Sequence, residues 1–596
     1  MRQLLAGLAV LSLSACATTP APTPDKATSP LAAPPPETSV VEAKPAPRWT
    51  SGAMVAAANP LAVEAGLEVL RAGGSAVDAA IAVQTTLSLV EPQSSGIGGG
   101  AFMLHYDAAT GDVVAYDGRE VAPAGATPTM FLRDDGKPMS FFQAVQTGRS
   151  IGVPGVVAML ELAHGRHGKL PWARSFQPAI KLSRDGFPVS ERLSGMVGDV
   201  QGFLTRTVGP DAALAPDAAA YLTLDGKTPL PKGHILKNPA YADSLALIAR
   251  DGAKAFYAGP LAEQIVAAAQ RGPTGGTLSM ADMAAYRAGV MEPVCRPYRV
   301  YLVCGMRPPS SGGIAVLGIL GVLENLDMAA TSPQRADGWH RFIEASRMSY
   351  ADRDMYVADD RFVAVPIDGL LDRDYLKGRG ARIQPERALA KVEAGDPPGA
   401  VRRGRDATGN IFGTSHFVVV DGKGNVVSMT TTVEAPFGSQ RMAGGFFINN
   451  QLTDFSFRPV DDQGQPIANA VAPGKKPRSS MSPTIIFEDG AFRLAVGSPG
   501  GNAIIGYVAK TVVGVLDWGL TPQQAIDLPN VVARGAVAVE RARMDPAILK
   551  QLQDMGHQIR DGRGAEGSGL HAVMVGPDGK LVGGADSRRE GVARAP

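Results

Sequence analysis

The amino-acid sequence predicts a layered α/β protein of the α+β kind, in which helices cover β-sheets. Residues 160–401 alternate helical periodicity with loops, whereas short runs rich in β-branched residues dominate after about Arg402. Two more helical stretches follow these runs, at 502–519 and 521–528. Sheets and helices of this kind bury their apolar faces against one another in layers. The 596 residues suffice for a large core, and 70 glycines fit close backbone approaches.

The chain begins with a pattern typical of export. Residues 1–15 have a basic start, a short apolar run and a small-residue end, which indicates a secretory signal peptide too short to span a membrane. The ending LSAC resembles a bacterial lipobox, which implies cleavage before Cys16 and lipidation of that residue; the alternative is an ordinary signal peptide. Residues 16–48 are rich in Pro, Thr and Ala and predict an extended tether.

These features predict an exported protein that contacts the membrane only through its lipid anchor. Ala17 follows the cysteine, and it is not the Asp associated with inner-membrane retention of lipoproteins in Gram-negative bacteria. We therefore expect the outer membrane, with the protein facing the periplasm.

The folded part is expected to begin near Trp49. A helix starts at Asn59-Pro60 and stops at Gly73-Gly74, and Ser75 starts a second, nearly all-apolar helix. A strand is expected over 101–106, after the glycine-rich loop GIGGGA. A dinucleotide-binding loop needs a strand before it and a helix after it, which is the reverse of the order here. We interpret these glycines as positions of close backbone packing.

Cys295 and Cys304 stand in the stretch VCRPYRVYLVC, whose spacing suits two strands of a hairpin with facing thiols. An oxidising compartment favours a structural disulfide over two buried thiols. No metal-ligand cluster accompanies them, and the acidic stretch 344–362 is interpreted as side chains that cap and pair around a helix end. The near balance of 58 Lys plus Arg against 57 Asp plus Glu gives no sign of a nucleic-acid partner. We predict no metal and no cofactor.

The stretch GTSHFVVVDGKGNVVSMTTTV predicts a β-hairpin about its GKGN turn. Symmetric pairing puts Val420 opposite Val427 and Ser415 opposite Thr432. Thr432 then lies beside Thr414, to within one residue of register.

A pair of hydroxyls at one strand end has chemical meaning only if one of them is activated. A threonine hydroxyl is a weak nucleophile, but an adjacent N-terminal amine, with a pKa near ~7.7–8.0, can act as its base. Such an amine requires a cut between Gly413 and Thr414, and glycine leaves the carbonyl open to attack. His416 lies about ~6–7 Å farther along an extended strand, so we interpret it as a structural histidine.

Several motifs together resemble the γ-glutamyltransferase (glutathione hydrolase) family. The C-terminal part carries GTSHFVVVD, INNQLTDF, GKKPRSSMSPTI and GSPGGN, and the N-terminal part carries SSGIGGGAFML, YDGREVAP, RPPSSGG and SYADRDMY. The resemblance runs from about Ser51 to the end. It implies the N-terminal-nucleophile hydrolase fold, an αββα four-layer sandwich. It also implies a precursor that cuts itself at Gly413–Thr414 into a large subunit, 49–413, and a small subunit, 414–596, which form a heterodimer.

The resemblance also implies how a γ-glutamyl group is bound. Arg119 binds the α-carboxylate, a role that suits the forked donors of a guanidinium, and Ser479 and Ser480 add hydroxyl donors. The α-ammonium is bound by Glu434, Gln451 and Asp454. Many relatives have Asn at the first of these three positions, and the extra carboxylate is expected to favour a charged amine.

For the reaction itself, the resemblance implies that Thr414 attacks and that Thr432 orients it. Gly500 and Gly501, just before a helix, supply the oxyanion hole, because backbone N–H groups at a helix start lack partners within the helix. A γ-glutamyl-threonine intermediate is released to water or to an acceptor amine. The segment 455–468 is short and contains no Tyr. The sequence therefore does not decide whether a lid closes over the site, or how hydrolysis and transfer are balanced.

The implied activity is cleavage of γ-glutamyl amides such as glutathione. A related acylase for glutaryl or cephalosporin side chains is an alternative, although its substrate lacks the α-amine that Glu434 and Asp454 would bind. Cleavage of poly-γ-glutamate, which needs an open groove, is another alternative. An unprocessed binding protein is a third.

Overall fold

The computed structural model describes residues 48–207, 209, 212–409, 413–561 and 567–596. The expected signal peptide, the lipidation site Cys16 and nearly all of the tether lie outside these residues. Across the described parts of the chain, none of the helices combines the length and the apolar character needed to cross a membrane.

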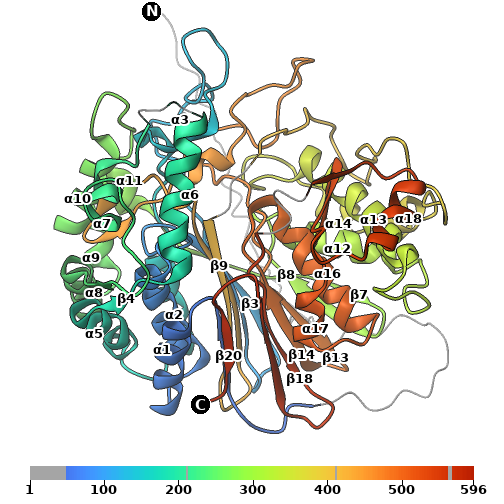
Figure 1. Ribbon diagram of the computed structural model, residues 1–596, viewed down its shortest axis with the longest axis horizontal. Helices are drawn as coiled ribbons and strands as arrows, with labels where there is room; N and C mark the ends of the chain where they lie inside the picture. The colour runs from blue at the N-terminus through green and yellow to red at the C-terminus, as the bar shows by residue number, and fades with distance from the viewer. Residues whose placement is uncertain (1–47, 208, 210–211, 410–412, 562–566) are drawn as a thin grey trace, which may run out of the picture.

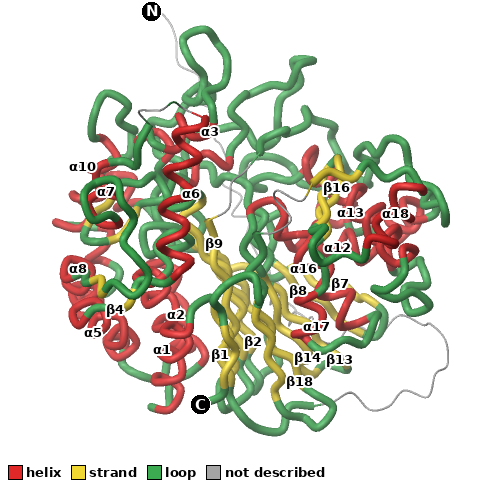
Figure 2. The backbone as a smooth tube through the Cα atoms, viewed as in Figure 1, coloured by secondary structure: helices red, strands yellow, loops and turns green. Residues whose placement is uncertain are grey.

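Two antiparallel β-sheets lie face to face between two layers of helices, and the four-layer αββα arrangement predicted from the sequence is confirmed (Figure 1). Figure 2 shows the strands gathered in the centre with helices on both sides. The first sheet has the order β20-β1-β9-β10-β2-β3-β6, with the bounds Val592–Arg594, Met54–Ala57, Gly413–Val420, Val426–Glu434, Gly100–Tyr106, Val113–Gly118 and Gly289–Met291. The second sheet has the order β19-β18-β14-β13-β8-β7, with the bounds Leu581–Ala585, His571–Val575, Ala491–Gly497, Thr484–Glu488, Tyr301–Gly305 and Val294–Tyr298.

The helices divide between the two outer layers and their extensions. On the side of the first sheet lie α1 Pro60–Arg71, α2 Ala76–Val90, α4 Val156–His167, α5 Gln177–Asp185, α6 Glu191–Thr207, α7 Pro216–Leu222, α8 Pro239–Asp251, α9 Lys254–Tyr257 and α10 Pro260–Gln270. On the side of the second sheet lie α12 Gly312–Leu323, α13 Ala336–Tyr356, α14 Ile367–Leu370, α15 Arg373–Gly380, α16 Ile504–Leu516, α17 Pro522–Asp527 and α18 Pro546–Asp554. Shorter elements are α3 Phe141–Val145, α11 Met280–Ala285, β4 Phe187–Pro188, β5 Ile235–Leu236, β11 Met442–Ala443, β12 Phe446–Phe447, β15 Val531–Arg534, β16 Ala536–Val539 and β17 Ile559–Asp561.

The first two helices begin where their capping residues predict. The Asn59 side chain accepts the N–H of Leu61, with Pro60 in the first turn. Ser75 and Asp78 form a capping box, and every residue of α2 is buried. Full burial explains why α2 is mostly apolar and has no solvent-facing polar side.

The glycine-rich loop that follows α2 packs as its glycines indicate. A Cβ on Gly99 would lie 1.9 Å from the Thr432 carbonyl oxygen, and one on Gly100 would lie 2.2 Å from a Glu120 carboxylate oxygen. Neither position can hold a side chain, so this loop brings β2 directly against the end of β10.

The central hairpin, β9–β10, forms as predicted, but the predicted register is wrong by one residue. Val420 pairs with Val426, and Thr432 pairs directly with Thr414. The reason is the turn: the Asp421 carboxylate accepts the N–H groups of Lys423 and Asn425, so that position 421 pairs with position 425 and only residues 422–424 lie between them. A symmetric four-residue turn would shift the pairing.

Alternation along β9 decides what each side chain meets. Phe417 and Val419 pack with the α1–α2 layer, whereas Val418 and Val420 pack between the sheets. By the same period of two, Thr414 faces the layer between the sheets. The predicted cysteine pair lies across β7 and β8, where Cys295 and Cys304 are register partners joined by a disulfide.

Candidate active site

The predicted site residues converge at one end of the β-sandwich. Strand β9 starts there and its partner β10 ends there. In the second sheet, the loop 479–482 leads into β13 there, and the loop 498–501 leaves β14. Because paired strands in both sheets are antiparallel, these strand starts and strand ends meet at the same end of the sandwich. The elements come from distant parts of the sequence, and the fold assembles them.

A small cavity at this end collects nearly all of the predicted residues. Its free volume is about 20 Å³, which is close to the room that one water molecule needs. The predicted residue Gly500 is not in its lining, although Gly501 is. The lining is Arg119, Thr414, Thr432, Glu434, Gln451, Asp454, Ser479, Ser480, Met481, Gly501 and Ile504.

Thr414 and Thr432 form a hydroxyl pair at the end of the hairpin. Their Oγ1 atoms are 3.1 Å apart, and the Thr432 hydroxyl donates to the Gly413 carbonyl oxygen at 2.7 Å. Since Thr432 has only one proton to donate, Thr414 is the donor within the pair. The backbone N–H of Glu434 fills the remaining acceptor position of Thr432 at 2.8 Å. Thr432 therefore orients the Thr414 hydroxyl and polarises the carbonyl of the preceding peptide bond.

Gly413 is required here by close packing. A Cβ at this position would lie 2.5 Å from the Glu434 carbonyl oxygen and 2.7 Å from the Ala435 carbonyl group. The register shifts at this point, between Thr432 and Glu434, and Glu434 has a φ of 83°. A non-glycine residue in this region of φ stores strain, which commonly marks functional positions.

His416 lies away from this chemistry, as interpreted from the sequence. It is fully buried, and its Nδ1 is 2.9 Å from the Thr430 hydroxyl. Burial lowers the pKa of His416 well below its ordinary value, and the neighbouring His571 adds to the effect. The ring fills the space over Gly497, where a Cβ would lie 2.3 Å from it.

Arg119 is a buried guanidinium held in place by backbone carbonyls. Its Nε donates to the Pro477 carbonyl, and its Nη2 donates to the Arg478 carbonyl and to Asp454 Oδ2, the last at 2.5 Å. Among the described residues, its Nη1 has no hydrogen-bond partner. Nε and Nη2 are therefore fixed in place, whereas Nη1 lies 3.7 Å from the Glu120 carboxylate.

The three residues predicted to bind an ammonium group are clustered. Gln451 donates to Asp454 at 2.7 Å, and the Glu434 carboxylate accepts from Asn450 at 2.7 Å. Burial, and then the charge of Asp454, raise the pKa of Glu434 well above its ordinary value. Burial therefore disfavours the second negative charge that is expected here, and a bound ammonium would favour it by lowering that pKa.

The two predicted serines lie on the opposite wall. Ser479 Oγ accepts the N–H of Met481, and the Ser480 hydroxyl donates to Asn502 Oδ1 at 3.0 Å. Gly500 and Gly501 stand just before α16 with φ values of 137° and 55°, conformations that favour glycine. A side chain at Gly500 would also collide with the Tyr507 ring. This turn points the start of a helix at the cavity.

Three charged residues near the cavity escaped the sequence-based reasoning. Arg353 donates to Ser480 Oγ at 2.5 Å and to Asn502 Oδ1 at 2.8 Å. Arg589 donates to the Thr414 carbonyl at 3.1 Å. Glu120 is buried beside Arg119, and its two carboxylate oxygens accept no hydrogen bond from any described residue; burial raises its pKa to about 8.

Arg353 belongs to the motif SYADRDMY, for which the sequence predicts only contacts around a helix end. The stretch 344–362 was expected to cap and pair around a helix end, and Arg353 does pair with Asp354 in the last turn of α13. The same guanidinium also reaches into the second sheet to hold Ser480. Only the packing of α13 against that sheet creates this second contact. Among the described residues, no group of three or more His, Cys, Asp or Glu is placed to hold a metal.

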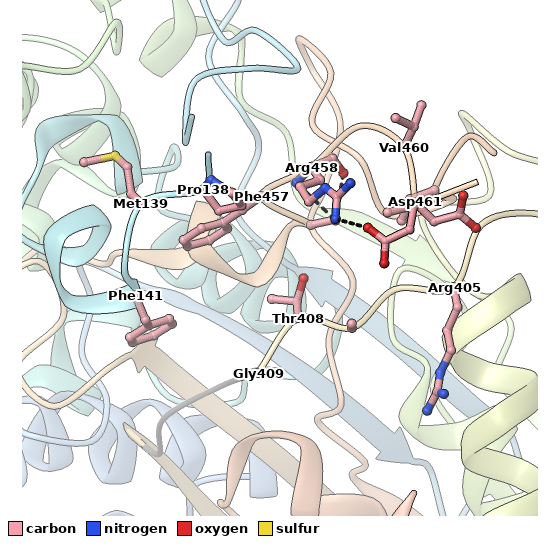
Figure 3. A pocket seen from close by; sticks show the side chains of 14 residues that line it. Pro138, Met139, Phe141, Arg405, Thr408, Gly409, Phe457, Arg458, Val460 and Asp461 are labelled. Carbon is pink, nitrogen blue, oxygen red and sulfur yellow. Dashed lines mark hydrogen bonds and ion pairs between the residues drawn. The ribbon is translucent and has the colours of Figure 1, made fainter. Parts of the chain in front are cut away.

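A larger cavity, of about 520 Å³, lies beside the segment where a lid was considered (Figure 3). It is lined by 456–458, 460–462 and Ile467, by 407–409 and Arg405, and by 138–139 and Phe141. Phe457 stacks on Phe131 at 4.6 Å, which anchors this segment to the body of the protein. The segment therefore lines the larger cavity, and Asp454, just before it in the chain, lines the small one.

Comparisons with known proteins agree with this geometry. The family described as gamma-glutamyltranspeptidase matches residues 62–595. The chain is 38% identical to the glutathione hydrolase proenzyme of Escherichia coli (strain K12) and 36% identical to that of Bacillus subtilis (strain 168), over about nine tenths of each chain. The crystal structure of cephalosporin acylase from Bacillus halodurans superposes with a TM-score of 0.79 at 27% identity, covering 94% of this chain and 98% of that one. The fold is therefore that of the N-terminal-nucleophile hydrolases, and the chain belongs to the gamma-glutamyltranspeptidase family.

Proposed function

We propose that this protein is a self-processing γ-glutamyltransferase and glutathione hydrolase with Thr414 as its nucleophile. The observation that carries this proposal is the convergence of Thr414, Arg119 and Asp454 on one cavity. It brings a nucleophile together with groups that suit an α-carboxylate and an α-ammonium, which are the two charges at the γ-glutamyl end of glutathione. The names of the E. coli and B. subtilis relatives support the same substrate.

Processing takes place within β9. Thr414 Oγ1 attacks the Gly413 carbonyl carbon, the C–N bond breaks, and the hydroxyl proton ends on the departing amine, so that Gly413 becomes an ester of Thr414. Water then hydrolyses this ester. The products are a large subunit that ends in the Gly413 carboxylate and a small subunit that begins with the free amine of Thr414. The hydrogen bond from Thr432 to the Gly413 carbonyl supports the first step.

The freed amine then serves as the base for the substrate reaction. It takes the proton of the Thr414 hydroxyl as Oγ1 attacks the γ-carbonyl carbon, and it returns that proton to the leaving amine. The result is a γ-glutamyl ester of Thr414. Water or an acceptor amine attacks this ester, which gives glutamate or a new γ-glutamyl amide. Water or the acceptor amine supplies the proton that restores the Thr414 hydroxyl, and no step transfers electrons, so the reaction as written needs no cofactor.

The test has two parts. N-terminal sequencing of the purified protein should show a fragment that begins Thr-Ser-His-Phe, together with a larger fragment. Turnover of a γ-glutamyl anilide should then exceed turnover of its glutaryl analogue, which lacks the α-amine. An uncut chain after incubation near neutral pH would contradict the proposal.

A second candidate is an acylase that takes glutaryl or cephalosporin side chains. It is favoured by the superposition with the Bacillus halodurans acylase over 94% of the chain. The cluster of Glu434, Gln451 and Asp454 argues for an amine-bearing substrate instead, since Arg119 already pairs with Asp454, whereas Glu434 adds a second buried carboxyl group that an ammonium group would suit. Preference for the glutaryl anilide would make the acylase the better assignment.

We also propose that the mature protein is anchored to the outer membrane through lipid on Cys16, facing the periplasm. The lipobox-like ending LSAC and the tether at 16–48 support this. Radioactive palmitate should label the wild-type protein in cells, and the Cys16→Ser variant should be unlabelled and released in soluble form. Equal labelling of both proteins would contradict the anchor.

A further inference from the structure

The segment just before the proposed cut is fastened to both walls of the small cavity. Residues 404–409 belong to the large subunit in the proposed processing, whereas the residues they contact at 466–469 and 478 belong to the small one. Gly404 N–H donates to the Pro466 carbonyl at 2.9 Å, and Arg534 donates to the Thr408 carbonyl at the same distance. Thr408 and Gly409 line the larger cavity, opposite residues 457–461 (Figure 3).

Asp406 is the buried centre of this attachment. It is 1% exposed, and its Oδ2 accepts from Arg478 Nη2 at 2.7 Å and from Asn469 Nδ2 at 3.0 Å. Its Oδ1 accepts the N–H of Thr408 at 2.9 Å. Neighbouring Arg478 helps to hold the pKa of Asp406 below its ordinary value despite burial, so the carboxylate is charged.

Each of the two residues whose side chains bind Asp406 also supports one wall of the small cavity. Asn469 Nδ2 donates to the Asp454 carbonyl at 2.7 Å, and its Oδ1 accepts the N–H of Arg478 at 2.9 Å. The carbonyl of Arg478 accepts from Arg119 at 3.0 Å, and Ser479 and Ser480 follow in the chain. Asn469 thus spans the gap between the ammonium-binding and carboxylate-binding sides.

The Asp406 carboxylate, the Asp454 carbonyl and the Arg478 N–H together fix which way the Asn469 amide faces. An asparagine amide can rotate by half a turn, which exchanges its donor and its acceptor. With an acceptor in place on the Nδ2 side and the Arg478 N–H on the Oδ1 side, only one orientation satisfies every partner. Without the carboxylate, Arg478 would keep a buried charge with a weaker partner, Asp354 at 3.8 Å, and the Asn469 amide would lose one of its two acceptors.

We propose that Asp406 is a positioning residue for substrate binding that acts across the cut. In the processed enzyme, the end of the large subunit would keep Asp406 in place, and Asp406 would set the spacing between Asp454 and the Arg119–Ser479–Ser480 wall. This inference rests on the proposed function, because it concerns the α-amino and α-carboxylate groups of a γ-glutamyl substrate. In this proposal Asp406, which is among the last ten residues of the large subunit, supports the binding of these groups and not the chemical step.

The test compares Asp406→Asn with wild type, using glutathione and a γ-glutamyl anilide as donors. The variant is nearly isosteric, yet it places an amide opposite the Arg478 guanidinium. We expect cleavage at Gly413–Thr414 to be retained and KM to rise about tenfold or more, as for loss of a charge-assisted hydrogen bond. The rise should be the same for both donors, because they share the glutamyl end, and kcat should change by less than about threefold.

Asp517→Asn is the matched control. Asp517 is also a buried carboxylate paired with an arginine, at 3.2 Å from Arg299, but it lies at the C-terminal cap of α16, the end away from Gly501. The Asp517→Asn variant should have a lower melting temperature than wild type and an unchanged KM. Hydrogen exchange at 404–409 should be faster in the Asp406 variant than in wild type and unchanged in the control.

Three outcomes would overturn the inference. One is an unchanged KM with a lowered melting temperature, which would make Asp406 purely structural. Another is loss of cleavage in Asp406→Asn, which would assign the residue to processing. The third is a fall in kcat at constant KM. Failure of the proposed function is distinguishable from all three, since wild type itself would then turn over neither donor.

Discussion

The Arg119 guanidinium lies 2.5 Å from the Asp454 carboxylate, so the two groups assigned to opposite charges of the substrate are paired with each other. Both are largely buried, and the cavity around them has room for about one water molecule. An α-amino acid head group brings one charge of each sign. It can therefore insert beside the pair and satisfy both partners without leaving a buried charge alone, which would be costly.

Removing the guanidinium should weaken substrate binding and spare processing. Arg119→Ala leaves Asp454 without its cation and the substrate carboxylate without charged donors. We expect KM to rise by about tenfold to a hundredfold, from the worth of a hydrogen bond to a charged group, with normal cleavage at Gly413–Thr414. Steady-state kinetics on the purified variant measure this. Arg250→Ala, which removes an exposed pair with Asp251, is the control. A normal KM in Arg119→Ala would mean that the carboxylate site is elsewhere.

Thr432 should matter for processing through its hydroxyl alone. Thr432→Val keeps the shape and removes the donor to the Gly413 carbonyl. We expect cleavage to slow by about 10²–10³-fold, the usual effect of losing one donor to a developing oxyanion. A time course on denaturing gels measures the rate. Thr431→Val is the control, because the Thr431 hydroxyl is also buried and makes no hydrogen bond with the described residues. Equal rates in both variants would contradict the role of Thr432.

Gly413 should tolerate no side chain. Gly413→Ala would press a Cβ into the backbone of Glu434 and Ala435. We expect slower cleavage and a melting temperature lower by several degrees, as a strain of about 1–3 kcal/mol implies. Gly422→Ala, in the hairpin turn with nothing within 4 Å of its Cβ, is the control. If the two variants behave alike, cleavage does not depend on the close packing of Gly413 against Glu434 and Ala435.

Glu120 should make stability depend on pH. Its pKa is about 8 in the folded protein and near 4.5 when unfolded, so unfolding releases a proton between these values. The free energy of unfolding then falls as pH rises from about 4.5 to 8. Glu120→Gln removes this contribution and should flatten the decline in melting temperature over that range. Glu344→Gln, which alters a buried carboxylate already paired with Arg347, should lower stability without flattening it.

Glu434 should couple substrate binding to proton release. A bound ammonium lowers the raised pKa of this carboxyl, so binding a non-hydrolysable γ-glutamyl analogue should release a proton at neutral pH. Calorimetry in two buffers with different ionisation enthalpies measures the number released. Glu434→Gln should bind more weakly and release none. Proton release that persists in the variant would place the coupling on another group.

Most residues that line the small cavity could be predicted, because they lie in motifs that resemble those of the family. Thr414, Arg119, Asp454 and the serine pair were all assigned from short sequence patterns. The exact pairing of β9 with β10 was not, because a turn that is one residue shorter than the symmetric one moves the register, and closure of this turn depends on the Asp421 side chain. The contacts of Arg353 and Asp406 were also beyond reach, since each depends on how one element packs against another.

The sequence by itself determined the layered fold, the capped helices, the hairpin and the chemistry that each motif can perform. The fold class, the helices and the hairpin follow from local periodicity, capping and turn residues, whose partners are within a few positions along the chain, whereas the chemistry of the motifs follows from their resemblance to the family. Only the tertiary structure decided that Thr432 faces Thr414 directly, that Glu434 is pushed toward its neutral form, and that Asp406 connects both walls of the cavity. The reason is physical: burial, register and pairing of charges depend on groups that lie far apart in the sequence, and folding alone brings them within hydrogen-bond distance.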